Sequence, residues 1–176
     1  MKSRIAIQHD VDGPVTIDEM MVPDPEPDQV TIKLYATGLC HSQLHQMGAT
    51  NLKRPLVLGH EATGIVTRKG KSVTHVDEGD NVIVTWITKV VDNGDTKFMS
   101  PLRTISDKKI HGILIYTWAE EVIARGDHIF PISKEYPTDV TSILGCAVAT
   151  GFGAVVNTAQ VRPGSSVAVF GVGGVG

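Results

Sequence analysis

Short runs rich in Val, Ile and Thr, several of them alternating apolar and polar positions, recur along the chain as far as residue 132. Such runs are typical of half-buried β-strands, and turn-forming Gly, Pro and Asp residues separate them. Many short strands with regular turns predict a barrel-like or sandwich-like β domain. The predicted strands cover residues 4–8, 15–20, 29–38, 62–70, 81–87, 118–124 and 128–132.

The apolar spacing becomes helical in two places. Residues 38–48 permit a short helix that ends at Gly48. In residues 139–161, apolar side chains recur at roughly helical spacing until Pro163 and Gly164 end the pattern.

Two other segments have a different pattern. Residues 165–170 form an apolar run that predicts a buried, parallel-type strand leading into glycines. Residues 88–113 are polar and weakly patterned, which predicts a long loop or lobe.

Composition and charge narrow the class of protein. The formal net charge is −3 and both signs are interspersed, so no basic stripe indicates a nucleic acid or an anionic membrane as partner. No stretch approaches the roughly 18 apolar residues of a membrane span, and the N-terminus lacks the apolar centre of a secretory signal. We therefore expect a cytoplasmic protein.

The chain contains two cysteines, Cys40 and Cys146. A disulfide framework explains two cysteines poorly in a chain without a secretory signal, so buried free thiols and metal ligands are the alternatives. Zinc prefers thiolate and neutral imidazole ligands, and a catalytic zinc keeps three protein ligands and one open position. The sequence offers His60 and Glu61 as further candidates.

Several segments resemble the signature segments of the zinc-dependent medium-chain alcohol dehydrogenases. They are GLCHSQLH around Cys40, GHEATGIV from residue 59, GDNVIV from residue 79, and the stretch from Gly145 to the last residue. The resemblance covers nearly the whole chain. It implies a β-rich (α+β) GroES-like barrel domain over residues 1–148. A connecting helix and the first strand and Gly-rich turn of an α/β Rossmann domain would follow over residues 149–176.

The same resemblance implies which side chains bind the metal. Cys40, His60 and Cys146 would bind one catalytic Zn²⁺, and Glu61 would be an alternate or nearby ligand. A zinc ion used as a Lewis acid lowers the pKa of a bound alcohol, which prepares it to give hydride to a nicotinamide coenzyme.

Further roles follow from the resemblance alone. Ser42 would take part in proton transfer from the substrate hydroxyl, and His45, one helical turn further on, would pass that proton towards solvent. His41 would meet the coenzyme pyrophosphate, and Thr150 would touch the nicotinamide. Trp86 would line the substrate pocket, although a core position after a strand explains it equally well.

The chain departs from the family pattern in two respects. The position that commonly holds a carboxylate next to the zinc-binding histidine is Gln43 here. We expect Gln43 to accept a hydrogen bond from the imidazole, although losses around a metal ligand cost about 10–100-fold in metal affinity or activity. No cysteine lies between Trp86 and Trp118, so we expect no structural zinc.

The glycines at the end of the chain match the start of a dinucleotide-binding turn. Gly171, Gly173 and Gly176 give the G-x-G-x-x-G spacing after an apolar run, and Val175 would contact the nicotinamide by resemblance. The helix that binds the pyrophosphate and the residue that selects NAD or NADP would follow later. We therefore expect a truncated fragment that is inactive alone and marginally stable.

The resulting hypothesis is the catalytic part of an alcohol dehydrogenase. The parent enzyme, a homo-oligomer, would oxidise a small alcohol to an aldehyde or ketone with NAD or NADP. The alternatives are a zinc-binding module without catalysis and a half-enzyme completed by a partner. A zinc-free quinone-reductase-like relative is less favoured, because all the expected metal ligands are present.

Overall fold

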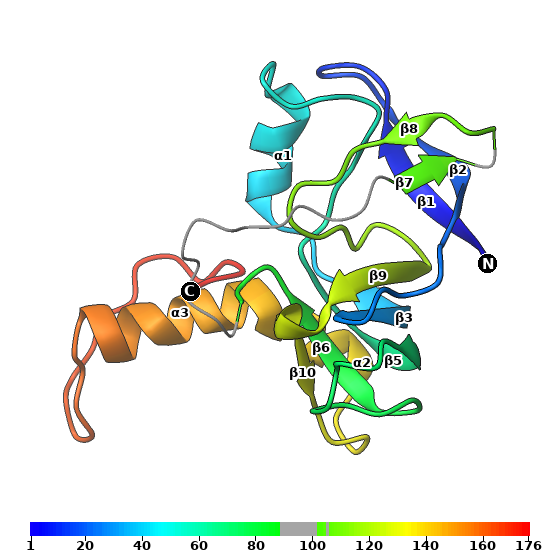
Figure 1. Cartoon of the computed structure of the whole chain (residues 1–176). Coiled ribbons are helices and arrows are strands. Elements are labelled where there is room, and N and C mark those ends of the chain that lie inside the picture. The colour runs from blue at the N-terminus through cyan, green and yellow to red at the C-terminus, as the bar shows by residue number, and fades with distance from the viewer. Residues whose placement is uncertain (89–101, 105) are drawn as a thin grey trace.

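The computed structural model describes residues 1–88, 102–104 and 106–176. In these residues the strands form two five-stranded antiparallel sheets, with the orders β4-β1-β2-β7-β8 and β10-β6-β5-β3-β9. Figure 1 shows the first sheet beside α1 and the second below it. The strands are β1 (Lys2–Gln8), β2 (Val15–Met21), β3 (Gln29–Thr37), β4 (Leu56–Val57), β5 (Glu61–Lys69), β6 (Asn81–Thr85), β7 (Leu102–Thr104), β8 (Lys109–Ile110), β9 (Glu121–Arg125) and β10 (Ile129–Pro131).

The seven strands predicted from the alternating runs are all present, as β1, β2, β3, β5, β6, β9 and β10. The three strands that were not predicted, β4, β7 and β8, are only two or three residues long. A segment this short has no period of its own, so its strand geometry depends on the neighbour it pairs with. The β-rich fold class is confirmed.

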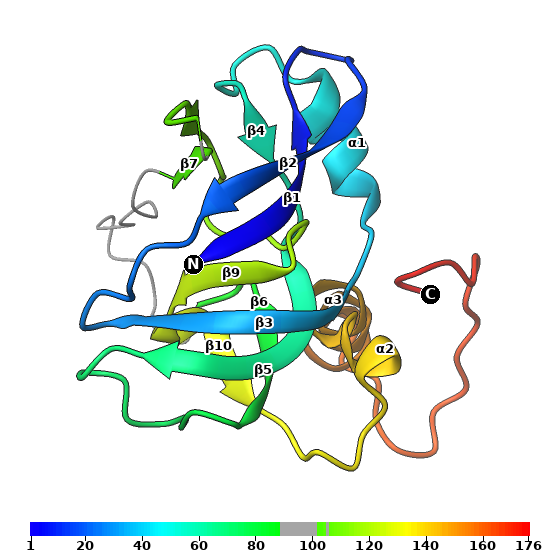
Figure 2. The same ribbon diagram turned by 90° about the vertical axis from the view of Figure 1, so that its right-hand side faces the viewer.

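One apolar core joins the two sheets. Ile5 and Ile7 of β1 and Ile32 of β3 are each at most 1% exposed and belong to the same buried cluster. A bridge between Ile5 and Ala119 brings the first sheet against the segment that leads into β9. Figure 2 shows β1 lying beside β9, which in turn lies beside β3.

Helical structure follows the two predicted regions. The first helix, α1 (His41–Gly48), ends at the predicted glycine. The second region contains α2 (Thr138–Thr141) and α3 (Ala149–Gly153), together with the π-helical turns η2 (Leu144–Val148) and η3 (Ala154–Thr158). Figure 1 shows this helical segment extending away from the sheets. None of the helices in the described ranges has the length and apolar character needed to cross a membrane.

The strand predicted for residues 165–170 is absent from the structure. Val167 is 54% exposed and Phe170 is 97% exposed, so the run is not buried either. A strand is stable only when a neighbouring strand satisfies its N–H and C=O groups, and residues 165–170 pair with none of the described strands. The domain boundary at residue 148 stays a prediction, and most of the predicted lobe, residues 89–101 and 105, lies outside the described residues.

A buried histidine connects the turn before β10 to the end of β6. His128, the last residue of the 3₁₀ turn η1 (Gly126–His128), is 5% exposed. Its Nδ1 lies 2.9 Å from the carbonyl oxygen of Thr85. Because a carbonyl only accepts, Nδ1 donates this bond and carries the ring's proton. Burial lowers the pKa of His128; Asp127 and the Thr85 carbonyl raise it by less, and Arg125 adds the smallest effect, which lowers it.

This arrangement predicts a pH-dependent loss of stability. Because the pKa of His128 is lower in the folded than in the unfolded chain, the unfolded chain takes up its proton first as pH falls below about 6.5. Protonation therefore favours unfolding, with a slope of at most about 1.4 kcal/mol per pH unit for one group. His128→Asn, whose amide can reach the Thr85 carbonyl, should show a shallower slope between pH 7 and 5.

The measurement is urea unfolding at several pH values in the presence of a chelator, so that metal binding does not contribute. His111, whose pKa is also lowered, is only partly buried, and His111→Asn is the matched control that should retain most of the slope. Equal slopes for the unchanged chain and His128→Asn would contradict the prediction.

Candidate metal centre

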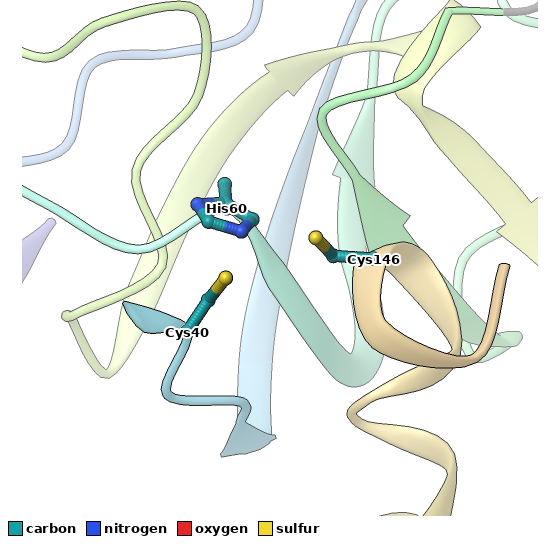
Figure 3. Close-up of side chains that lie close together, drawn as sticks. All are labelled: Cys40, His60 and Cys146. Carbon is teal, nitrogen blue, oxygen red and sulfur yellow. The ribbon is translucent and has the colours of Figure 1, made fainter. Parts of the chain in front are cut away.

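Three predicted metal ligands meet at one edge of the second sheet. Cys40 lies just after β3, at the start of α1, His60 lies just before β5, and Cys146 lies in η2. One ligand atom of each residue lies within 4.8 Å of the other two (Figure 3). A tetrahedral zinc with bonds of about 2.0–2.3 Å holds its ligand atoms about 3.5–3.8 Å apart. The three ligand atoms therefore lie close to the spacing that a bound zinc requires.

The pairing of the strands brings these positions together. β3 and β5 are antiparallel, with Thr37 opposite Ala62, so the end of one strand meets the start of the other. β5 and β6 are also antiparallel, with Glu61 opposite Thr85. The Thr85 hydroxyl donates a hydrogen bond to the carbonyl oxygen of Gly145, which attaches η2 to the end of β6. Cys146 is thereby held beside the other two ligands.

A glycine before His60 allows the chain to enter β5. Gly59 has a φ of +92°, and a Cβ on it would lie 2.3 Å from Thr117 Oγ1 and 2.6 Å from Trp118 Cδ1. Both the backbone conformation and the close contact exclude a larger residue. His60 is thus directed by a rigid turn, and burial lowers its pKa. The imidazole is kept neutral, which is the state that binds a metal.

The ligands border a cavity of about 300 Å³. Trp86 is 45% exposed and lines this cavity, so the structure places it at the pocket wall rather than in the core. Burial raises the pKa of Cys146, whereas a hydrogen bond from Trp86 lowers it. The lining residues are Cys40, Ser42, Gln46, Val57, Leu58, Gly59, His60, Trp86, Ile113, Leu114, Ile115 and Cys146.

The apolar part of this wall was not predicted. Val57 is the last residue of the two-residue strand β4 and Leu58 follows it, whereas residues 113–115 lie at the end of the polar segment and just beyond it. A parallel bridge from Leu56 to His111 brings the two segments together. The apolar letters GILI at 112–115 were the only local sign, and they resemble any buried strand.

The hydrogen bond of Gln43 runs in the opposite sense to the expectation. Gln43 Oε1 lies 2.6 Å from the backbone nitrogen of Cys40, and Gln43 Nε2 lies 3.1 Å from His60 Nδ1. The amide therefore donates to the imidazole instead of accepting from it. The physical reason is that the backbone N–H of Cys40 requires an acceptor and the amide has only one oxygen.

Glu61 lies behind the three ligands. It is 1% exposed, and its Oε2 accepts a hydrogen bond of 3.2 Å from the backbone N–H of Ala147. Burial raises the pKa of Glu61, while the backbone N–H groups of Ala147 and Cys146 lower it. The compact metal-binding group found in the described residues does not include this carboxylate. Its role as an alternate ligand stays a prediction.

The two residues predicted for proton transfer differ in position. Ser42 is half-buried, lines the cavity, and lies with Oγ 3.3 Å from Cys40 Sγ. His45 is exposed and does not line the cavity, and its ring centre lies 5.1 Å from that of His41, which is also exposed.

The residues predicted to bind coenzyme do not line this cavity. Thr150 is exposed on α3, and Gly171, Gly173, Val175 and Gly176 lie in the exposed last segment. Gly171 has the positive φ of +92° that a glycine turn requires. The last segment folds back to α3, where a Cβ on Gly151 would lie 2.4 Å from the carbonyl oxygen of Val175.

The turn at Gly59 gives a testable prediction. Gly59→Ala should destabilise the chain by more than the roughly 1–3 kcal/mol of a strained backbone, because the new methyl group also overlaps Thr117 and Trp118. Gly79 has a similar φ of +90° but has nothing within 4 Å of its Cβ position. Gly79→Ala is therefore the matched control that reports the backbone contribution alone. Chemical unfolding checks both, and equal losses would contradict the role given to the contact.

Comparisons with known proteins agree with this geometry. Residues 26–134 match the alcohol dehydrogenase GroES-like domain. The chain is 34% identical over 199 aligned positions to S-(hydroxymethyl)glutathione dehydrogenase of Synechocystis sp., an alignment that takes in 100% of this chain and 54% of that protein.

Solved structures show the same likeness. An alcohol dehydrogenase zinc-binding domain protein from Burkholderia ambifaria is 26% identical with a TM-score of 0.85, covering 94% of this chain and 51% of that one. Benzyl alcohol dehydrogenase of Acinetobacter calcoaceticus shares the fold at 24% identity and a TM-score of 0.80, with the same coverage. The chain spans about half the length of these relatives. It belongs to the family of zinc-type medium-chain alcohol dehydrogenases, of which it contains the GroES-like domain.

Proposed function

We propose that this chain supplies the metal-binding and alcohol-binding part of an enzyme that oxidises a small alcohol to an aldehyde or ketone. The observation that carries the proposal is the group formed by Cys40, His60 and Cys146 at the wall of a cavity. Two thiols and one imidazole are a donor set that suits zinc, and three protein ligands leave a fourth position open. A zinc ion held here would act as a Lewis acid towards the oxygen of an alcohol.

The side chains around the ligands suit such a substrate. Ser42 lines the same cavity as the ligands, so its hydroxyl can accept a proton from a bound alcohol by hydrogen bonding. Val57, Leu58 and Ile115 give the rest of the wall an apolar surface that accommodates a hydrocarbon substituent. His45 lies one turn further along α1 and is exposed, so it is suited to exchange that proton with solvent.

Hydride transfer requires a coenzyme, and NAD or NADP is the proposed acceptor. The relatives named above are about twice as long as this chain, so their whole activity is proposed here only for the complete enzyme. The predicted coenzyme contacts Thr150 and Gly171 are exposed and line no part of the cavity. The homo-oligomeric state of the complete enzyme is likewise a proposal.

Metal binding is the first test. The unchanged chain should bind about one equivalent of zinc, and Cys146→Ala should lose most of it because two ligands do not hold zinc against a chelator. His60→Ala should have the same effect. Metal analysis after dialysis against a weak chelator measures the loss. His9 is exposed and outside the site, so His9→Ala is the matched control, and equal zinc in all four proteins would refute the site.

Coenzyme reduction is the second test. With a simple alcohol and NAD or NADP, the chain alone should give no turnover, because its predicted coenzyme residues Thr150 and Gly171 are exposed and do not line the cavity. Addition of a separately produced coenzyme-binding half of a relative should restore some turnover. Ser42→Ala should then lower the rate by about 100-fold or more, the usual contribution of a proton-transferring group.

The outcomes of this second test separate the alternatives. Turnover by the chain alone would contradict the expectation that coenzyme binding needs a further part. Zinc binding without turnover under any condition, including the complemented one, would favour the zinc-binding module without catalysis. In both cases turnover is measured by the absorbance of the reduced nicotinamide.

A further inference from the structure

Gln43 is hydrogen-bonded to two of the proposed metal ligands. It is 1% exposed, and both ends of its amide are hydrogen-bonded, one to the backbone of Cys40 and the other to the ring of His60. No alternative partner from solvent is open to a side chain buried to this degree. The amide therefore links the start of α1 directly to the imidazole of His60.

The partners of Gln43 determine which way its amide points. A backbone N–H always donates, so the atom 2.6 Å from the Cys40 nitrogen must be the amide oxygen. The amide nitrogen is then the atom that lies 3.1 Å from His60 Nδ1. This orientation also closes the first turn of α1, since a Gln at the third helical position commonly accepts from the N–H of the capping residue.

The orientation of the amide in turn sets the tautomer of His60. The NH₂ group of Gln43 can only donate a hydrogen bond, so His60 Nδ1 must accept it with a lone pair. A neutral imidazole with a lone pair on Nδ1 carries its proton on Nε2. Since Nδ1 is hydrogen-bonded to Gln43, only Nε2 remains to bind a metal. In this tautomer Nε2 carries the proton and has no lone pair to offer.

Resting on the metal centre proposed above, we propose that Gln43 is a positioning residue that holds His60 in the tautomer unable to bind a metal. Metal binding then requires the amide to turn over and release the Cys40 N–H. In that step one proton leaves Nε2 and one is taken up at Nδ1, so the ring stays neutral. The reversed amide accepts from Nδ1–H with its oxygen but presents its NH₂ group to the backbone N–H of Cys40.

This change carries a free-energy cost that a carboxylate in the same place would not carry. A carboxylate accepts with both oxygens, so it can bind the Cys40 N–H and a His60 Nδ1–H together. In Gln43 one of the two must lose its partner, and a buried N–H without a partner is unfavourable. The same three ligands therefore bind the metal more weakly beside Gln43 than they would beside a carboxylate. Metal binding is also coupled to the hydrogen bond that caps α1.

The first experiment needs no metal. Nitrogen-15 NMR of the metal-free chain should show His60 protonated at Nε2, with Nδ1 unprotonated. Hydrogen exchange should show a protected Cys40 amide, and this protection should fall when one equivalent of zinc is added. A metal-free His60 protonated at Nδ1 would overturn the inference, and so would a Cys40 amide that remains equally protected with zinc.

The second experiment compares zinc affinities by competition with a chelator. Gln43→Glu should tighten zinc binding by about 10–100-fold and should keep the Cys40 amide protected in the zinc-bound state. Gln46 lies on the same helix and lines the cavity, so Gln46→Glu is the matched control that adds the same charge without touching His60 Nδ1. An equal gain from both variants would assign the effect to charge and overturn the inference.

The two proposals can fail separately. If neither the unchanged chain nor Gln43→Glu binds zinc, the metal centre is refuted, while the tautomer of the metal-free His60 still decides the role of Gln43. If the unchanged chain binds zinc and Gln43→Glu binds it more tightly than Gln46→Glu does, both proposals are supported. Circular dichroism of each variant checks that α1 and the sheets are retained.

Discussion

The candidate centre depends above all on the register of the second sheet. β3 and β5 are antiparallel with Thr37 opposite Ala62, and β5 and β6 are antiparallel with Glu61 opposite Thr85. The end of β3, the start of β5 and the end of β6 therefore meet at one edge, and a shift of the register would separate them. Segments far apart in sequence thus deliver their metal-binding side chains to one place, while the apolar core behind them holds the strands in position.

The geometry at this edge depends on the hydrogen bonds of two buried polar side chains as well as on packing. Glu61 and Gln43 are each 1% exposed and must satisfy their hydrogen bonds within the protein. Glu61 accepts from the backbone beside Cys146, and Gln43 accepts from the backbone of Cys40. The backbone beside Cys40 and Cys146 is thus bound to buried side chains, so a change in Gln43 or in the protonation of Glu61 would alter the geometry of the ligands.

The last part of the chain shows how an apolar pattern depends on its surroundings. Residues 165–170 are as apolar as a buried strand, yet Phe170 is 97% exposed and no strand forms. These residues precede the glycines predicted to form a dinucleotide-binding turn, and Gly171 has a positive φ of +92°. Local conformation can form in isolation, whereas a β-strand requires a partner to bond with.

The sequence by itself determined the β-rich class, seven of the strands and the two helical regions, because the period of apolar residues is a local property. Its resemblance to the family's signature segments also predicted Cys40, His60 and Cys146 as metal ligands, and the structure brings these three residues together. Tertiary structure alone decided three matters: the pairing of the short β4, the exposure of residues 165–170 and the direction of the Gln43 hydrogen bond. The first two depend on partners distant in the chain. The third depends on competition between the Cys40 N–H and the His60 ring for one amide oxygen, which a local sequence pattern does not show.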